Sequence, residues 1–279
     1  MVQIRSFTST YSADRLPIQR HYNLLEILLS KLYNETGPPW VRHSMQPKKI
    51  AFGTLIIALL LQTTPIQPRA WVLEKDRLAP IPLSSGTIPL EPVTKTDFNS
   101  DGIFETVAIL QNAAQIRSGS QVLWQSPPGW QVIEAMVTDL NHDGAPEAAL
   151  LVWRPFKPWP VDAWLPAGGR IESFHDEAGD SCHLILIGWQ RDKFREVWAG
   201  SALAEPVKSF FPADLNGDGR QELVTLEGSY ADSRSAPARA LKVWEWNGFG
   251  FSNVSGMDGR FEAMTIAYSG DGRTLILVP

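Results

Sequence analysis

Residues 97–105 read Asp97-Phe98-Asn99-Ser100-Asp101-Gly102-Ile103-Phe104-Glu105, and the same acidic pattern returns twice further along the chain. It recurs at 139–147 as Asp-Leu-Asn-His-Asp-Gly-Ala-Pro-Glu and at 214–222 as Asp-Leu-Asn-Gly-Asp-Gly-Arg-Gln-Glu. Each copy is followed at once by an apolar run typical of a β-strand, and β-like segments also precede the copies. This recurrence predicts a repeat architecture in which acidic loops join neighbouring β-strands.

The spacing of the loops predicts the size of the repeat. A four-stranded propeller blade takes roughly 40–50 residues, which fits the interval between the first two copies. The interval between the second and third copies is longer, because it holds an insertion at residues 155–180 that is rich in proline, glycine and charge. A decayed fourth copy, Ser269-Gly270-Asp271-Gly272-Arg273, keeps the Asp-Gly pair, and Ala267 and Leu275 replace the outer acids.

The predicted fold class is therefore all-β: a small β-propeller of about four blades over residues 71–279, with the acidic loops between the first two strands of blades. In the third unit, turn residues separate four expected strands. These strands cover residues 207–215, 222–228, 240–246 and 249–254.

Closure of the ring is a separate question, since the chain has room for three blades and part of a fourth. Residues 261–269 and 274–279 would supply two strands of the last blade. A segment around Trp71 to Pro82 is expected to complete that blade and close the ring. The alternative is an open array, which would leave sheet edges exposed.

The acidic loops have the chemistry of calcium sites, because calcium takes six to eight oxygen ligands and tolerates irregular geometry. The side chains of Asp, Asn and Asp at positions one, three and five are expected to point inward, and glycine at position six permits the sharp bend. Position seven would offer its backbone carbonyl, and Glu at position nine would close the site. An EF-hand is excluded, since its position-twelve Glu is missing and the flanks are strand-like. The predicted ligands are Asp97, Asn99, Asp101, Ile103 and Glu105; Asp139, Asn141, Asp143, Ala145 and Glu147; and Asp214, Asn216, Asp218, Arg220 and Glu222.

With these motifs, the chain from about Pro92 to Pro279 resembles the FG-GAP/VCBS-type repeat proteins, whose blades carry Asp-x-Asn/Asp-x-Asp-Gly-x-x-Asp/Glu between their first two strands. The resemblance implies a β-propeller with structural calcium in the blade loops. It also implies a secreted or surface protein that binds other molecules. Members of this family often have seven blades, whereas this chain is long enough for about four.

The overall composition limits the function classes. The formal net charge of −5 argues against a nucleic-acid-binding protein, which would show a basic stripe. The single cysteine, Cys182, excludes a disulfide within the chain, and its apolar surroundings in the sequence predict a small buried side chain. The tryptophans at positions 124, 153, 189, 198, 244 and 246 are expected to pack between blades, since aromatic rings dominate core burial.

The N-terminal region predicts export from the cytoplasm. Residues 50–61 are apolar and uncharged, and they directly follow Lys48 and Lys49. This pattern describes a signal peptide over residues 45–70, with a signal-anchor over residues 50–66 as the alternative. Residues 1–44 are either an extension from a start codon placed too early or a short cytoplasmic tail. Both interpretations place the later chain outside the cytoplasm, as a secreted, periplasmic or cell-surface domain.

The preferred function is a non-catalytic binding module for a protein or carbohydrate ligand, with any membrane contact made by the N-terminal anchor. Trp159 and Trp164 of the insertion are candidate ligand platforms, because long loops in compact domains are often functional. A polysaccharide hydrolase or lyase that uses the acids of residues 155–180 is one alternative. A purely structural surface protein is the other. A metal held by protein oxygens leaves little room for an activated water, so the calcium loops favour a role without catalysis.

Overall fold

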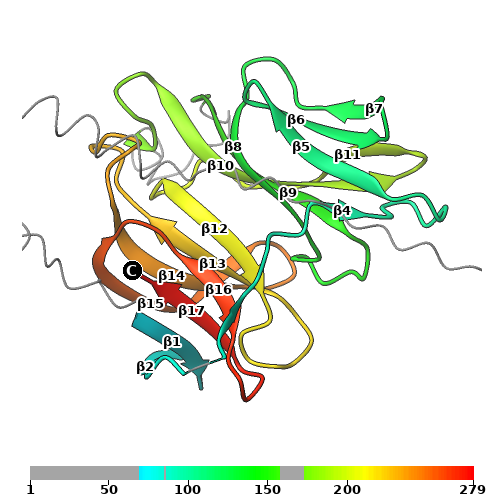
Figure 1. The fold of residues 1–279 in the computed structure, drawn as a ribbon. Coiled ribbons are helices and arrows are strands. Elements are labelled where there is room, and N and C mark those ends of the chain that lie inside the picture. Colours follow the sequence, from blue (N-terminus) through cyan, green and yellow to red (C-terminus); the bar gives the residue numbers. More distant parts are fainter. Residues whose placement is uncertain (1–68, 85, 158–172) are drawn as a thin grey trace, which may run out of the picture. The chain divides into compact units, whose positions relative to one another are not determined.

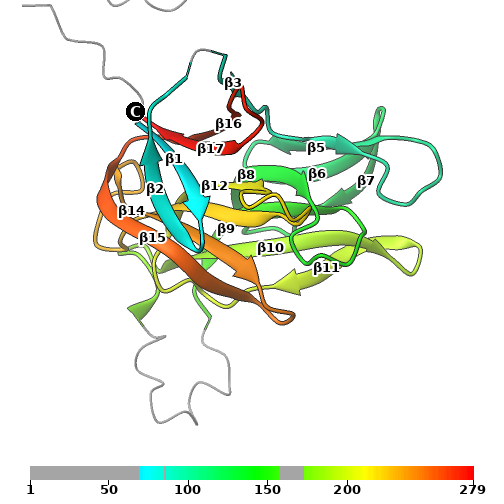
Figure 2. The ribbon, with the colours of Figure 1, turned by 90° about the horizontal axis from the view of Figure 1, so that it is seen from below.

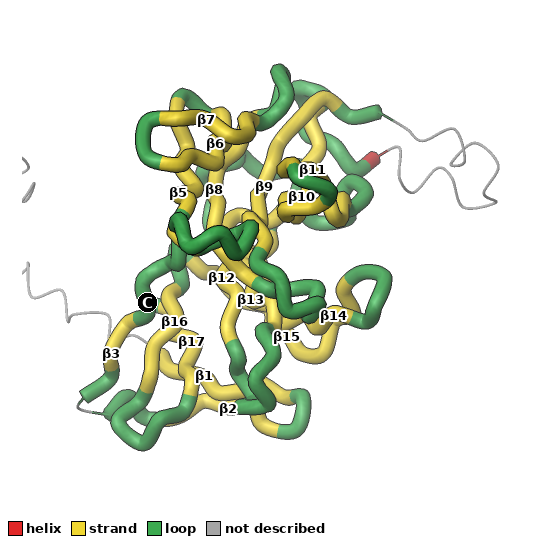
Figure 3. The backbone as a smooth tube through the Cα atoms, turned by 90° about the vertical axis from the view of Figure 1, so that its right-hand side faces the viewer, coloured by secondary structure: helices red, strands yellow, loops and turns green. Residues whose placement is uncertain are grey.

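The computed structural model describes residues 69–84, 86–157 and 173–279 of the chain. The described residues all lie in the second of two units of the chain, Ile66–Pro279. Of the predicted signal segment, residues 45–68 and everything before them lie outside the described residues, whereas Arg69 and Ala70 belong to the first described strand. Figure 3 shows that the described chain is made of strands and loops almost throughout. The described residues contain no helix long and apolar enough to cross a membrane.

The described strands form four antiparallel sheets, which are the blades of the molecule (Figure 1). Blade 1 contains β4 (Lys95–Thr96), β5 (Glu105–Leu110), β6 (Ala113–Ser118) and β7 (Gln121–Gln125). Blade 2 contains β8 (Gln131–Thr138), β9 (Glu147–Pro155), β10 (Asp180–Gln190) and β11 (Lys193–Ala199). Blade 3 contains β12 (Val207–Ala213), β13 (Glu222–Glu227), β14 (Ala238–Trp246) and β15 (Phe251–Phe261).

Blade 4 combines the two ends of the second unit, in the strand order β2-β1-β17-β16-β3. Its strands are β1 (Arg69–Glu74), β2 (Arg77–Ile81), β3 (Ile88–Pro89), β16 (Thr265–Tyr268) and β17 (Thr274–Val278). The N-terminal β1 pairs antiparallel with the C-terminal β17, so that Trp71 lies opposite Ile276 (Figure 2). The predicted closure by an N-terminal segment is therefore confirmed.

The four sheets are arranged as a four-bladed β-propeller, which confirms the predicted fold class. Three hydrophobic clusters lie between neighbouring blades. Phe98 and Ile116 of blade 1 pack with Leu150 and Ile185 of blade 2. Blades 2 and 3 share a second cluster, and blades 3 and 4 share a third. At these three junctions the apolar side chains of one sheet are covered by the next sheet, so packing between blades holds neighbouring sheets together.

The tryptophans lie where the sequence predicts them. Trp153 is buried between blades 2 and 3, where the half-buried Trp198 and Trp244 pack against the same cluster. Trp124 and Trp189 pack between blades 1 and 2. Trp246 of blade 3 meets Trp198 of blade 2 edge to face, with ring centroids 5.7 Å apart.

Cys182 is fully buried, as predicted. Its surroundings are apolar, and burial raises the pKa of the thiol to about 12. The thiol is therefore neutral at physiological pH and serves as a small core side chain.

The last strand of blade 3 is longer than the sequence pattern suggests. We expected residues 249–254, but β15 runs from Phe251 to Phe261. Two register shifts in its pairing with β14 let the strand continue through a polar, glycine-containing stretch. As the outermost strand of its sheet, β15 has mostly exposed side chains, so it does not show the apolar alternation by which an inner strand is recognised.

Candidate metal centre

The three acidic loops occupy equivalent places in the fold. They join the first and second strands of their blades: β4 to β5, β8 to β9, and β12 to β13. The glycine at position six has a positive φ in all three loops, at 86° for Gly102, 83° for Gly144 and 86° for Gly219. Glycine adopts this conformation without steric cost, as the motif predicts. Position four also has a positive φ, although Ser100 and His142 occupy it in the first two loops.

The same hydrogen bonds hold each turn. The Oδ2 of the position-one Asp accepts a hydrogen bond from the position-six amide, at 2.8 Å for Asp97, 3.1 Å for Asp139 and 2.9 Å for Asp214. The position-five Asp accepts a hydrogen bond from the position-seven amide at 2.7, 2.9 and 2.8 Å in chain order. These bonds fold the acidic side chains back over their own backbone, which orients their oxygens toward the inside of the turn.

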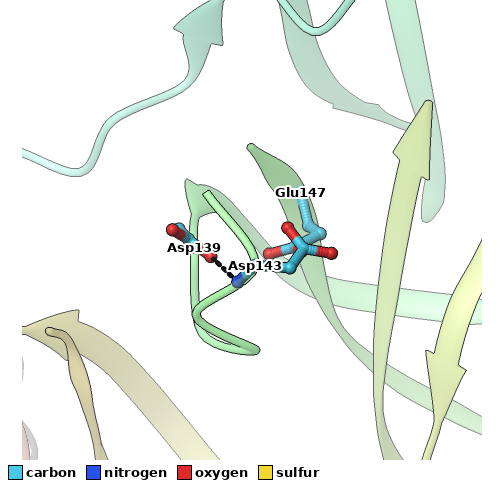
Figure 4. Close-up of side chains that lie close together, drawn as sticks. All are labelled: Asp139, Asp143 and Glu147. Atoms are coloured by element: carbon cyan, nitrogen blue, oxygen red, sulfur yellow. Dashed lines mark hydrogen bonds between the residues drawn. The ribbon is translucent and has the colours of Figure 1, made fainter. Parts of the chain in front are cut away.

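The second loop gathers its carboxylates most closely. The ligand atoms of Asp139, Asp143 and Glu147 all lie within 4.8 Å of one another (Figure 4). Among the described residues, this is the only group of three or more His, Cys, Asp or Glu side chains so placed. Glu147 is only 1% exposed, and its Oε2 has no hydrogen-bond partner. A buried carboxylate oxygen without a partner is costly, and a cation at this point would satisfy it.

The electrostatics of Glu147 also favour a cation. Burial, together with the nearby charges of Asp143 and Asp139, raises the pKa of this carboxyl to about 8, although hydrogen bonds from the Leu140 amide and the Asn141 side chain act in the opposite direction. A bound divalent cation would reverse this balance, because it favours the charged form of all three acids. The residues of the second loop therefore fit a metal ion.

The first and third loops carry the same residue types at the ligand positions, but their carboxylates are arranged differently. The Oε2 of Glu105 accepts a hydrogen bond from the Phe98 amide at 3.0 Å. Glu222 accepts one from Leu215 N at 2.8 Å and another from the side-chain amide of Asn216 at 2.8 Å. The position-nine acids of these loops accept amide hydrogen bonds from their own turn, as Glu147 also does, but neither has a buried oxygen without a partner. Their carboxylates do not form a group as close as that of the second loop.

The decayed fourth copy is a shorter turn. Strands β16 and β17 pair up to Tyr268 and Thr274, which leaves a tight turn of residues 269–273 between them. Ala267 and Leu275, which replace the outer acids, pair directly and are fully buried. The remaining acid, Asp271, forms an exposed ion pair with Arg273 at 2.9 Å. This turn therefore closes by backbone pairing and apolar packing.

The acidic loops border the central cavity of the propeller, which has a volume of about 860 Å³. Asp97, Asp139 and Asp214 all line it.

The second and third loops are also joined directly, because the side-chain oxygen of Gln221 accepts hydrogen bonds from Thr138 Oγ1 at 2.7 Å and from the Asp139 amide at 3.0 Å. Gln221 was not singled out in the sequence, since position eight of the motif carries no expected ligand.

The insertion is described only at its ends, and Trp159 and Trp164 lie outside the described residues. At its C-terminal end, Asp176 and Asp180 both form ion pairs with Arg234 of blade 3, at 2.5 and 2.8 Å. Arg234 also lies over the ring of Trp153, with its guanidinium carbon 4.0 Å from the ring centre. These acids therefore connect blades 2 and 3, an arrangement that supports a structural role for them. Arg234 stands in a serine-rich loop that gives no sequence signal for this contact.

Arg234→Ala is expected to lower the free energy of unfolding by about 1–2 kcal/mol at neutral pH, because it removes charged hydrogen bonds and a cation–π contact. About a third of the side chain is exposed, which keeps the effect modest. Burial alone would raise the pKa of Asp176, but the hydrogen bonds from Arg234 and the Asp180 amide outweigh it, so the pKa lies below the ordinary 3.8. The contribution is therefore complete above the unfolded-state pKa and is lost as pH falls through the lower folded-state pKa.

Urea unfolding of wild type and variant across the acidic range measures this contribution. Arg239→Ala is the matched control, because Arg239 forms a comparable ion pair with Asp232 but is 62% exposed. We expect no measurable change for this control. Equal stabilities of wild type and Arg234→Ala at neutral pH would contradict the proposed connection.

Comparison with known proteins gives no family assignment. No protein-family model and no curated protein sequence matches the chain. Among solved structures, the chain is similar to one in the crystal structure of BBS1N in complex with ARL6DN, soaked with mercury, with 12% sequence identity and 69% of each chain covered. The TM-score of this match is 0.22, and a likeness of this degree carries no argument about function. What stands is the arrangement of four antiparallel sheets as a β-propeller with acidic turns.

Proposed function

We propose that this protein is an extracytoplasmic, calcium-stabilised β-propeller of the FG-GAP/VCBS type that acts as a non-catalytic binding module. The observation that carries the calcium part is the second loop, where three carboxylates converge and the buried Glu147 Oε2 has no partner. The first and third loops repeat its sequence and its hydrogen-bonded turn.

Calcium fits these loops better than other common cations. The candidate ligands are oxygens from carboxylates, one Asn side chain and one backbone carbonyl per loop, and such hard ligands suit calcium or magnesium rather than zinc or copper. Magnesium demands near-ideal octahedral geometry, whereas calcium accepts the irregular set that a tight turn offers. Within the second loop, Asp139, Asn141, Asp143, Ala145 and Glu147 would hold the ion.

The proposed ion has a structural role. The acids that would bind it are tied to amides of their own loops, and they lie where neighbouring strands of a blade meet. Binding there stabilises the turn between two strands and relieves repulsion among clustered carboxylates. The extracytoplasmic location rests on the basic and apolar pattern of residues 48–61, and mass spectrometry of the mature N-terminus tests it.

Asp143→Asn is expected to reduce the calcium stoichiometry by one, because it removes a carboxylate from the converging group of the second loop. Isothermal titration calorimetry on the metal-depleted protein measures the number of sites. Asp271→Asn is the matched control, since Asp271 holds the equivalent position in the fourth turn, where the other acids are replaced. The control should bind as many ions as wild type, and an unchanged stoichiometry in Asp143→Asn would refute the assignment of the second loop.

A further inference from the structure

A second cavity lies between blades 2 and 3 and has a volume of about 360 Å³. One wall comes from blade 2, through Leu151, Leu184 and Trp198, and the other from β12 to β15 of blade 3. The connector between β11 and β12 forms part of the lining, where Ser201, Ala202 and Ala204 are small side chains. Small side chains at this point leave the space between the two sheets open.

The wall of this cavity is largely aromatic. Trp198 and Phe251 meet edge to face with ring centroids 5.3 Å apart, and both line the cavity. Phe210 and Trp244 of blade 3 also line it, as does Phe174 from the described end of the insertion. Cavities of this size with aromatic and apolar walls are typical of small-molecule sites.

The buried polar groups of the cavity wall already satisfy one another. Glu227 is buried, and its Oε2 pairs with Lys242 Nζ at 2.6 Å. Its Oε1 accepts hydrogen bonds from Thr225 Oγ1 at 2.9 Å and from Trp244 Nε1 at 2.9 Å. The inner wall therefore carries a positive and a negative charge that neutralise each other, and the one further charged residue of the lining, Glu205, is exposed to solvent.

We infer that this cavity binds an uncharged small molecule with an aromatic ring. The aromatic walls offer edge and face contacts to such a ring. A charged ligand would lose its hydration without gaining a free counter-charge from the wall, which is unfavourable. This inference deepens the proposed binding function but is independent of the metal loops, because none of the predicted calcium ligands lines the cavity.

Three probes with one aromatic body test the inference on the full chain in the presence of calcium: 4-phenyl-1-butanol, 4-phenylbutyrate and 4-phenylbutylamine. Calorimetry measures affinity, and the tryptophan emission of the chain, to which Trp198 and Trp244 of the cavity wall contribute, gives a second readout. The alcohol is expected to bind saturably at one site, at least about tenfold more tightly than either charged analogue. Absence of saturable binding by the alcohol, or equal affinity for all three probes, would overturn the inference.

Ala202→Phe is expected to weaken binding of the alcohol by at least about tenfold, because it places a ring in space that the connector leaves open. Ala204→Phe is a second blocking variant and decides the test if Ala202→Phe does not melt cooperatively. Ala263→Phe is the matched control, since Ala263 is an exposed residue between blades 3 and 4 that does not line the cavity. Wild-type affinity in both folded blocking variants would place the probe elsewhere and overturn the inference. A melting temperature that does not change when calcium is removed would instead count against the proposed metal role and would leave the inference about the cavity standing.

Discussion

Removing calcium with a chelator is expected to lower the melting temperature by about 10 °C for each loop that loses its ion. An ion present at about a thousand times its Kd stabilises the folded state by about 4 kcal/mol per site. For a domain of this size, 1 kcal/mol corresponds to about 2–4 °C. The physical reason lies in the second loop, where Asp139, Asp143 and the buried Glu147 repel one another unless a cation joins them.

Differential scanning calorimetry with and without EDTA measures this shift, and added calcium in excess of the chelator should restore the original melting temperature. Magnesium at the same concentration is the control for general screening of charge, and we expect it to restore less. An unchanged melting temperature in EDTA, with the metal content shown to have fallen, would contradict the calcium assignment.

Deleting β17 by ending the chain after Arg273 is expected to prevent cooperative folding of the propeller. This strand lies inside the sheet of blade 4, with β1 on one side and β16 on the other. Its residues Leu275, Ile276, Leu277 and Val278 are all buried. Burial of four such side chains contributes about 6–12 kcal/mol, which is comparable with the whole stability of a typical domain, about 5–15 kcal/mol.

Urea unfolding followed by near-ultraviolet circular dichroism distinguishes a folded ring from a collapsed chain. Deletion of Pro279 alone is the control, because this residue is exposed and lies outside β17. It should leave the transition unchanged. Ile276→Ala provides a graded variant and should cost about 2–5 kcal/mol. A chain that ends at Arg273 and still unfolds cooperatively near the wild-type midpoint would show that blade 4 does not hold the ring closed.

The acidic loops could be located from the sequence because their chemistry is local. A turn that folds Asp side chains over its own backbone needs Asp, Asn and Gly at fixed spacing, so the motif places each turn between two strands. The same reasoning identified the decayed copy, where Ala267 and Leu275 replace the acids. The strand predicted over residues 274–279 matches β17, whereas the strand predicted over residues 261–269 is shortened at its start to β16, because the ends of a strand depend on backbone geometry.

The difference among the three intact loops was not visible in the sequence. All three share the same five ligand positions, yet within the described residues only the second loop brings three carboxylates together and leaves a buried oxygen of its position-nine acid without a partner. Residue identity alone does not determine side-chain conformation within turns of the same type, so the motif could not reveal this difference.

The sequence by itself determined the fold class, the place of the acidic turns and the N-terminal segment that completes the last blade, because repeat spacing and strand patterns are properties of neighbouring residues. Only the tertiary structure decided which loop gathers its carboxylates, that Arg234 joins Asp176 to Trp153, and that a neutral aromatic cavity opens between blades 2 and 3. These features depend on contacts between residues far apart in the chain, and such contacts exist only once the sheets have packed around the ring.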